Sequence, residues 1–367
     1  MNGKNLLHIA NYAAKYRGNF IESLSILDSN LQSSGVTSFY AFYLPDVDNP
    51  QPWMVDLEKA GKKVLYLSGD VFADYKKIRE LIKKENISLV HTHFITIKQY
   101  LSVALANAFS NFKTIMHFHN HSQKAGKLKS ILRNLVYRKC YMIGCSESVY
   151  HSIEENFPKN PKSFVDNGIY FQRIDKLDRA SRNEYNLKAD STVCLIFGFD
   201  FFRKGVDLAV KSIETLNKNG QNIELVISLS TNLEAVKENI IKILGYLPEW
   251  AHIIEARNDV YMLYNMADIF LSPSREEGLP YSVIEAAFSR CNVVMSDISA
   301  QKYLKVPYGI WHKEGDVSSL EEAILKAIQI GSEKEYNLEQ VREEIKNNYS
   351  VERWAEQIEM EYKKNEQ

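Results

Sequence analysis

The sequence predicts a two-domain α/β protein in which each domain has a parallel sheet with helices on both faces. Short apolar runs alternate with segments of helical periodicity along most of the 367 residues, a pattern typical of such sheets. A polar stretch at 173–191 interrupts the alternation, which then restarts. The length and the 45% hydrophobic content suffice for two cores. We therefore expect an N-terminal domain over 1–175, a C-terminal domain over 176–348 and a final helical segment over 349–367.

The first half of the chain contains seven apolar runs of strand length. They are Asn5–Asn11, Thr37–Leu44, Lys63–Ser68, Ser88–Phe94, Phe112–Asn120, Tyr141–Ser146 and Ser163–Ile169. Between several of them lie segments with apolar residues at helical spacing, such as Asp74–Asn86 and Lys98–Phe109. This order predicts a doubly wound parallel sheet.

The second half repeats the pattern. Strands are expected at Val193–Phe199, Ile223–Ser230, His252–Glu255, Ile269–Ser274, Asn292–Asp297 and Gly309–His312. Helices are expected at Gly205–Asn219, Leu233–Leu244, Tyr281–Arg290 and Ser318–Ile330. The last helix, Val351–Lys364, carries three large apolar residues at helical spacing and is expected to pack back across the domains.

Charge and cysteine content exclude some classes of protein. The net charge is −1, which gives no support to nucleic-acid binding. The four cysteines form no CxxC pair, a pattern typical of reduced, intracellular thiols. No apolar run approaches the roughly 18–20 residues of a membrane span. We therefore expect a cytoplasmic protein that at most contacts the inner face of the membrane.

One region has a marked local charge. No Asp or Glu occurs over 86–146, where eight lysines and arginines fall. Part of this region, Lys124–Lys139, combines five apolar residues with a rich set of Lys and Arg. Such a segment is either an amphipathic helix that faces the core or a helix that docks on anionic lipid headgroups.

The segment 267–287, ADIFLSPSREEGLPYSVIEAA, has the strongest chemical signature. A predicted strand leads into a loop with Glu277 and Gly278, and a helix with Glu285 follows. In doubly wound sheets, ligands bind at the carboxyl ends of the strands. The helix N-terminus offers N–H groups to anionic oxygens. A carboxylate inside that helix can accept bonds from two neighbouring hydroxyls, as a ribose presents them. We expect Glu277 and Glu285 to face the carboxyl end of the sheet and Glu285 to face a cleft, so that replacing Glu285 would barely affect folding.

This segment resembles the E-x7-E signature of retaining GT-B glycosyltransferases of the family-4 type. FGFDFFRKGVDLAVKSIETL at 197–216 is similar to the strand–GRLxxxKGxD–helix segment of that family. VDNGI at 165–169 resembles its NG turn, and MHFHN and IGCSES resemble elements on its acceptor side. The matches occur in family order over 116–296. The resemblance implies the GT-B fold, two Rossmann-like doubly wound domains that face each other across a cleft.

The resemblance also implies roles for individual residues. Lys204 and Arg203 would neutralise the donor diphosphate, Glu285 would bind the ribose hydroxyls, and His119 would lie near the anomeric centre. Glu277 would hold the donor sugar and phosphate together with the backbone of its neighbours. The remaining donor-side residues would be Gly198, Gly278, Leu279 and Pro280, and the acceptor side would comprise Gly18, Asn19, His119 and Asn120.

The implied reaction transfers a sugar, hexose or N-acetylhexosamine, from a nucleotide-diphosphate sugar to a glycan or lipid-linked acceptor with retention. UDP is the commonest donor nucleotide in the family. The implied setting is bacterial cell-surface polysaccharide synthesis, as in capsule, exopolysaccharide or lipopolysaccharide. The family works without a metal, and the nucleotide sugar is a substrate rather than a cofactor.

Two departures from the family pattern affect the expected site. The arginine that follows the first glycine of the GRLxxxKG segment is Phe199 here, while Arg203 directly precedes Lys204. We expect Arg203 to supply the missing charge. The paired glycines that follow the first strand in the family are reduced to Gly18.

Two other functions remain open from the sequence. Alternating histidines could form the site of a metal-dependent hydrolase; they are His91, His93, His117, His119 and His121. Against this, no acidic residue over 86–146 could complete such a site. The chain could also be a nucleotide-sugar-binding module without turnover. A DxD pattern, Asp46–Asp48, lies in a proline-flanked turn and indicates no cation site.

Overall fold

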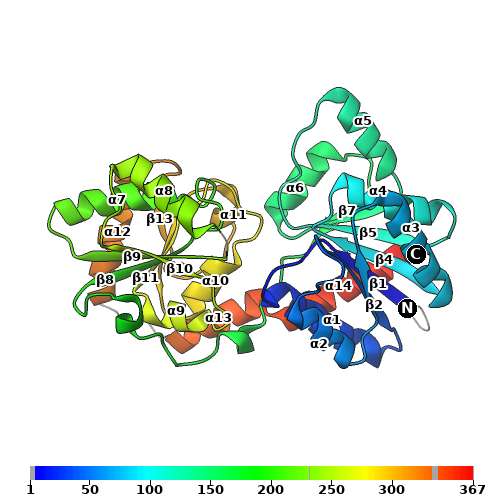
Figure 1. Ribbon diagram of the computed structural model, residues 1–367, viewed down its shortest axis with the longest axis horizontal. Helices are drawn as coiled ribbons and strands as arrows, with labels where there is room; N and C mark the ends of the chain where they lie inside the picture. Colours follow the sequence, from blue (N-terminus) through cyan, green and yellow to red (C-terminus); the bar gives the residue numbers. More distant parts are fainter. Residues whose placement is uncertain (1–4, 231, 333–337, 367) are drawn as a thin grey trace. The chain divides into compact units, whose positions relative to one another are not determined.

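The structure is a computed structural model that describes residues 5–230, 232–332 and 338–366. It divides into two compact units, each of which contains one parallel sheet with helices on both faces (Figure 1). Unit 1 comprises Met1–Gly168 and Val351–Gln367, and unit 2 comprises Ile169–Ser350. Residues 169–175 therefore group with the second unit, and the last helix groups with the first.

The sheet of unit 1 has seven parallel strands in the order β3-β2-β1-β4-β5-β6-β7. The strands are β1 (Asn5–Ala10), β2 (Ser38–Tyr43), β3 (Val64–Leu67), β4 (Ile87–His93), β5 (Lys113–Phe118), β6 (Cys140–Gly144) and β7 (Lys162–Phe164). Every strand expected in this half is present, with ends that differ by a few residues. The helices are α1 (Gly18–Ser33), α2 (Pro52–Lys59), α3 (Val71–Lys84), α4 (Ile97–Ala108), α5 (Lys127–Val136), α6 (Glu147–Asn156) and α14 (Val351–Glu366).

Local signals explain where these elements begin. All six residues of β2 are buried, as expected for a parallel strand that is covered on both faces. The Asp70 side chain caps α3 by accepting from the Ala73 N–H at 2.8 Å. Thr96 and Gln99 form a capping box at the start of α4. Among the described residues no helix is long and apolar enough to cross a membrane.

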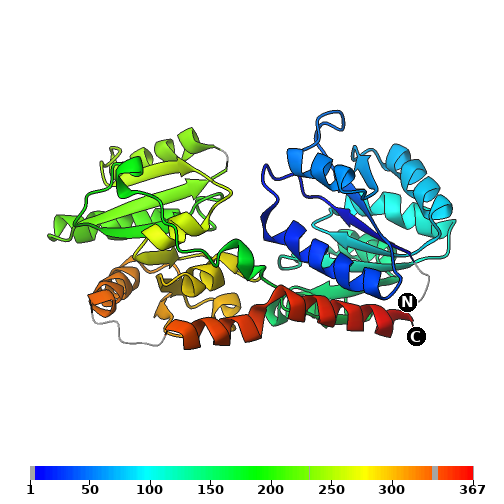
Figure 2. The same cartoon turned by 90° about the horizontal axis from the view of Figure 1, so that it is seen from below.

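The C-terminal helix α14 packs on unit 1 alongside α1 (Figure 2). The apolar residues expected at helical spacing, Trp354, Ile358 and Tyr362, are all buried. The Tyr362 hydroxyl lies 2.6 Å from His91 Nδ1, so this helix also contacts a polar group of the sheet.

The sheet of unit 2 has six parallel strands in the order β10-β9-β8-β11-β12-β13. The strands are β8 (Thr192–Phe197), β9 (Ile223–Leu229), β10 (Ala251–Glu255), β11 (Ile269–Ser272), β12 (Asn292–Ser296) and β13 (Ile310–His312). Its helices are α7 (Val206–Lys218), α8 (Leu233–Leu244), α9 (Tyr261–Met266), α10 (Tyr281–Phe288), α11 (Ser299–Lys302), α12 (Val317–Ser332) and α13 (Leu338–Tyr349), with short 3₁₀ turns at Phe171–Arg173 and Arg182–Tyr185. All strands and helices expected in this half are present.

Each sheet contains one point where the strand order reverses. In unit 1 this point lies between β1 and β4, and in unit 2 it lies between β8 and β11. Loops that leave the carboxyl ends of two such strands diverge, which opens a crevice where ligands bind in α/β sheets. The topology therefore predicts that ligands bind at the loops after β8 and β11 and at the carboxyl ends of β1 and β4.

A layer of buried histidines crosses the sheet of unit 1 at its reversal point. His8 of β1 lies in register with His91 of β4, and His93 of β4 lies in register with His117 of β5. All four side chains are buried. Burial lowers the pKa of His8 to about 4 and that of His117 to about 3, and it lowers the pKa values of His91 and His93 well below the usual 6.5. These imidazoles are therefore neutral at neutral pH.

This layer predicts that acid destabilises the protein at mild pH. Below about pH 6.5 the unfolded chain protonates its histidines, whereas the folded chain keeps His8 neutral until about pH 4. The free energy of unfolding should fall with decreasing pH by about 1.4 kcal/mol per pH unit for each such histidine. Urea unfolding between pH 7 and 5 measures the slope. His8→Gln should reduce the slope, whereas the exposed His151→Gln should not. A flat profile for the wild-type protein would show that the prediction is wrong.

Candidate functional site

Two loops at the reversal point of unit 2 form the candidate site. One loop, 198–205, joins β8 to α7, and the other, 273–280, joins β11 to α10. Gly205 brings them together. A Cβ at Gly205 would lie 2.0 Å from the Pro273 carbonyl oxygen, and its φ of +70° is a conformation that glycine adopts readily. The two loops can therefore approach this closely only with glycine at that position.

Arg275 ties the same two loops together, and sequence reasoning did not identify it. Its backbone N–H donates to the Arg203 carbonyl at 2.9 Å. Its guanidinium grips both Asp207 oxygens, at 2.8 and 2.7 Å, and also donates to the Phe202 carbonyl. Such a bidentate pair adds geometric specificity. Arg275 therefore holds the loop that carries Lys204 to the first turn of α7. Arg275 belongs to the SPSR segment and Asp207 to the KGVD segment, but the sequence does not indicate that these two residues pair.

Lys204 and Glu277 form the central ion pair of the site. Lys204 Nζ lies 2.6 Å from Glu277 Oε1, and the Ser274 hydroxyl donates to the same oxygen at 2.7 Å. Burial lowers the pKa of Lys204, and the adjacent Glu277 carboxylate partly offsets this effect. Sequence reasoning named both residues, but it did not predict that they bind each other.

Phe199 organises the two cations of the first loop. Lys204 Nζ lies 4.7 Å and the Arg203 guanidinium carbon 5.1 Å from the centre of its ring. Arg203 also donates to Asp200 Oδ2 at 3.0 Å and to the Glu276 carbonyl at 3.2 Å. The residue that replaces the family arginine thus places Arg203 and Lys204 beside one aromatic ring.

Glu285 lies in a second buried ion pair. The Arg173 guanidinium donates to its Oε1, and the Tyr264 hydroxyl donates to its Oε2 at 2.9 Å. Only 4% of Glu285 and 7% of Glu277 are exposed. Each carboxylate thus binds a cation within unit 2, a pairing that the sequence pattern did not predict. Arg173 lies in a 3₁₀ turn 112 positions earlier in the chain, where sequence gives no signal for this pairing.

The remaining donor-side candidates shape the backbone of these loops. Gly198 follows β8, and a Cβ there would lie 2.7 Å from Ile227. Gly278 and Leu279 are buried, and Pro280 directly precedes α10, whose N-terminus has no side-chain cap. An uncapped helix N-terminus favours anionic groups. Together with two cations and two carboxylates, this arrangement can bind a molecule that carries both phosphates and hydroxyls.

The acceptor-side candidates lie in unit 1, and two of them have structural contacts. Gly18 opens α1 with a φ of +60°, and a Cβ there would lie 2.6 Å from the Tyr12 hydroxyl oxygen. The Asn19 amide donates to the Gly168 carbonyl at 2.7 Å, which ties α1 to the NG turn. Asn120 is exposed.

His119 lies just after β5 and contacts the NG turn. Its Nδ1 is 3.4 Å from the Asn167 amide nitrogen, and its Nε2 is 3.3 Å from His93 Nδ1. Its ring stacks on Phe94 with centroids 4.0 Å apart. A substrate hydroxyl that bonds a ring nitrogen of His119 would therefore have to displace one of these partners.

A hollow of about 460 Å³ opens beside His119 in unit 1. Aromatic and apolar side chains line part of it, and Lys124, Lys129 and Arg133 line the rest. His121, which was expected to continue the strand face, lies beyond the end of β5 and lines the same hollow. The hollow therefore combines apolar and cationic surface.

Most of the histidines considered for a hydrolase are buried, although His93, His117 and the partly exposed His119 bring nitrogen atoms within 4.8 Å of one another. His91, His93 and His117 are 0–2% exposed, so a substrate cannot reach their rings. Hydrolytic metal sites keep one coordination position open to water or substrate.

The chain is similar in sequence to known glycosyltransferases. Residues 178–349 match the family model of glycosyl transferases group 1. The chain is 27% identical over 259 residues to the capsular polysaccharide biosynthesis glycosyltransferase CapH of Staphylococcus aureus, and the match covers 66% of this chain and 69% of CapH. It is 26% identical over 137 residues to the lipopolysaccharide glucosyltransferase WaaG of Escherichia coli K12, which covers 37% of this chain and 36% of WaaG.

The fold has close parallels among solved structures. HepE of Anabaena, solved in complex with UDP and glucose, superposes with a TM-score of 0.80 at 14% identity. This match covers 98% of the present chain and all of HepE. At such low identity the likeness shows the fold. Residues 178–349, just under half of the chain, thus match the glycosyl transferases group 1 model, and the chain has the GT-B fold and is similar to glycosyltransferases.

Proposed function

We propose that this enzyme transfers a hexosyl or N-acetylhexosaminyl group from a UDP-sugar to a glycan or lipid-linked acceptor, with retention, as family-4 enzymes do. The observation that carries the proposal is the pair of cations, Lys204 and Arg203, beside the Phe199 ring and bonded to the loop that precedes α10. The names of CapH and WaaG support a role in capsule or lipopolysaccharide synthesis.

The donor would bind to the two loops of unit 2. Lys204 and Arg203 would neutralise the diphosphate, with the uncapped N-terminus of α10 as a further partner. Glu277 would bind the donor sugar while it positions Lys204. Glu285 would accept bonds from the ribose hydroxyls. An ionised carboxylate has about four acceptor positions, so its bonds from Arg173 and Tyr264 leave room for a ribose.

Two cations at the diphosphate would make a divalent metal unnecessary for transfer. The positive charge that Mg²⁺ or Mn²⁺ supplies in other transferases would come from Lys204 and Arg203, which the loop contacts hold in position. Preorganised charge of this kind stabilises a departing phosphate without reorganisation during the reaction.

Retention would proceed by front-face transfer, in which the departing phosphate helps to deprotonate the acceptor hydroxyl. The ion pairs of both carboxylates support this proposal. Glu277 is bound to Lys204 and Glu285 to Arg173, and a carboxylate held by a cation is a poor nucleophile. A covalent glycosyl-enzyme intermediate on either residue is therefore not part of the proposal.

The acceptor would bind to unit 1 at the hollow beside His119 and Asn120. The cations that line this hollow suit an anionic acceptor such as a lipid-linked phosphate, and its apolar lining suits the adjoining lipid. Gly18 and Asn19 would support this side through the NG turn.

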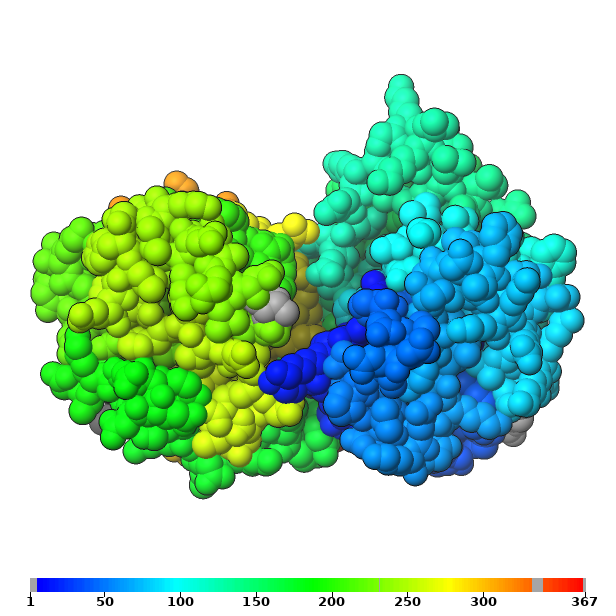
Figure 3. Space-filling view, viewed as in Figure 1, coloured from blue at the N-terminus to red at the C-terminus, as the bar shows by residue number. Residues whose placement is uncertain are grey.

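We also propose that α5 docks on anionic membrane. Together with the chain on either side of it, α5 projects from the body of unit 1 (Figures 1 and 3). None of its residues is buried, so it does not face the core. Leu128, Ile131, Leu132 and Leu135 are each more than half exposed. Exposed cations surround them, namely Lys127, Lys129, Arg138 and Lys139. An apolar stripe with a basic rim suits the surface of anionic lipid.

The first prediction compares the two cations. Lys204→Ala and Arg203→Ala should each lower turnover roughly a hundredfold or more, because each removes one donor to the departing charge. The release of UDP from a panel of UDP-sugars, with and without lipid-linked glycan, measures the rate. Lys211→Ala, which removes an exposed lysine of α7, is the matched control.

Two results would revise the proposal. Near-wild-type turnover for Arg203→Ala would leave Lys204 as the sole cation from this loop. Tight UDP binding by the wild-type protein without any release of UDP from UDP-sugars would indicate a binding module instead of an enzyme.

The second prediction concerns Glu285. Glu285→Gln should weaken UDP binding by on the order of 1.5–3 kcal/mol, because the bonds to ribose lose their charge. The ion pair with Arg173 changes the expectation for folding. The variant leaves that arginine without its counter-charge, so unfolding should also become easier by about 1–3 kcal/mol. Calorimetric titration and thermal unfolding measure the two effects.

Glu276→Gln is the matched control, since Glu276 is an exposed neighbour in the same loop and should leave the stability of the fold unchanged. If Glu285→Gln loses stability but binds UDP as tightly as the wild-type protein, Glu285 supports the fold and does not contact the ribose.

The third prediction concerns α5. The protein should co-sediment with vesicles that contain anionic phospholipid and much less with neutral vesicles, and binding should weaken with salt. Replacing both Leu128 and Ile131 by Gln should lower binding at least tenfold, because each buried apolar side chain contributes about 1.5–3 kcal/mol. Phe72→Gln, at an exposed position on α3, is the control. Equal binding by the double variant would show that α5 does not enter the membrane surface.

A further inference from the structure

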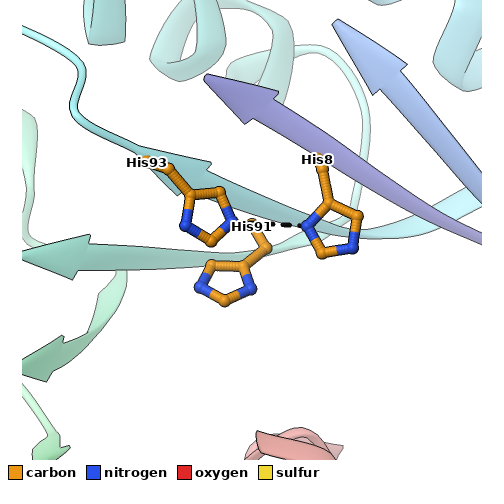
Figure 4. Close-up of side chains that lie close together, drawn as sticks. All are labelled: His8, His91 and His93. Carbon is orange, nitrogen blue, oxygen red and sulfur yellow. Dashed lines mark hydrogen bonds between the residues drawn. The ribbon is translucent and has the colours of Figure 1, made fainter. Parts of the chain in front are cut away.

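Three imidazoles meet in the core of unit 1, at the strands where the sheet order reverses (Figure 4). His8 comes from β1, and His91 and His93 come from β4. His91 and His93 point to the same face because side chains alternate along a strand. His8 lies in register with His91 on the neighbouring strand. The parallel register thus collects all three rings at one place.

The ring nitrogens lie at distances suited to a shared metal ion. Each of the three residues offers a nitrogen, and these atoms lie within 4.8 Å of one another. His8 Nδ1 and His93 Nε2 are 3.3 Å apart. In a tetrahedral zinc site with Zn–N bonds of about 2.0–2.1 Å, neighbouring ligand nitrogens are about 3.3–3.4 Å apart. One edge of such a site therefore already has the right length.

The surroundings of the rings also suit ligation. Within the described part of the chain, His91 Nε2 is buried without a hydrogen-bond partner. His91 Nδ1 lies 2.6 Å from the Tyr362 hydroxyl, the kind of outer bond that orients a metal-ligating histidine. That bond leaves Nε2 of His91 for an ion.

The chemistry of the three ligands selects the kind of ion. All three rings are buried, and neutral imidazole is the form of histidine that binds metals. Imidazole nitrogen suits zinc and neighbouring transition metals, whereas Mg²⁺ and Ca²⁺ require oxygen ligands. The charge of Asp28 acts on His8, and the Asp28 carboxylate forms an ion pair with Lys62, so we do not count it among the ligands.

We propose that His8, His91 and His93 hold one zinc-type transition-metal ion as a structural centre of unit 1. The ion would enter as the chain folds, because the folded unit buries all three ligands. It would bind no substrate, because all three ligands are buried in the core of unit 1. Transfer without Mg²⁺ or Mn²⁺ is therefore compatible with it.

The test measures the metal content of full-length protein expressed without a polyhistidine tag. After treatment with EDTA and gel filtration, the wild-type protein should retain about one zinc ion per chain by mass spectrometry of the metal. Refolding from urea with one equivalent of Co²⁺ should give the visible absorption of tetrahedral Co²⁺. A wild-type protein that retains no ion and shows no such absorption after refolding would overturn the proposal. The three rings would then only hydrogen-bond to one another.

Variants assign the ligands. His8→Gln and His91→Gln should each lower the metal content at least tenfold. The controls are His117→Gln, which changes an equally buried histidine of β5, and the exposed His151→Gln, and both should retain the ion. Loss of the ion from His117→Gln to the same extent would show that the ligand set is wrong. If a ligand variant fails to fold, the wild-type metal content and the Co²⁺ spectrum still decide. If the wild-type protein contains no metal but still releases UDP from UDP-sugars, the metal proposal is wrong and the proposed transfer stands.

Discussion

The close approach of the loops after β8 and β11 is the constraint on which the candidate donor site depends. Gly205 lies so near the Pro273 carbonyl that any side chain at that position would clash. Arg275 then joins the two loops through the Arg203 carbonyl and through both oxygens of Asp207. Because of these contacts, Lys204 meets Glu277 and the backbone before α10 follows a defined path. Neither loop alone would place a cation and a carboxylate 2.6 Å apart.

Opposite charges within unit 2 give this site a particular electrostatic character. Lys204 and Arg203 lie near Glu277, and Arg173 lies against Glu285, so each buried carboxylate has a cationic partner. Burying such groups without partners would cost several kcal/mol per ion. The pairs also orient the side chains, since a carboxylate bound on one edge keeps acceptor positions on the other. The cations of these pairs can then bind the phosphates of a ligand, and the carboxylates can accept bonds from its hydroxyls.

Unit 1 has a contrasting polar core. Its buried histidines lie in register across β1, β4 and β5, whereas Glu277 and Glu285, the buried carboxylates of the candidate site in unit 2, lie in a loop and a helix. His119 lies at the edge of this layer, where it contacts His93 and the NG turn through Asn167. The side proposed for the acceptor thus combines neutral hydrogen-bonding groups with the cations of the hollow, while the side proposed for the donor rests on ion pairs.

The sequence by itself determined the fold class and the strands of both described sheets, and it supplied the residues of the proposed donor site. Strand and helix periodicity are local properties, and the segments 197–216 and 267–287 carry their motif within twenty or so residues each. Only the tertiary structure decided which charges pair. Arg173 is 112 positions from Glu285, and Arg275 is 68 positions from Asp207, so no local pattern records either contact. For the same reason, the sequence did not predict that folding buries each carboxylate against a cation. Burial and pairing depend on which loops the sheet order brings together, and that order arises only when distant strands assemble.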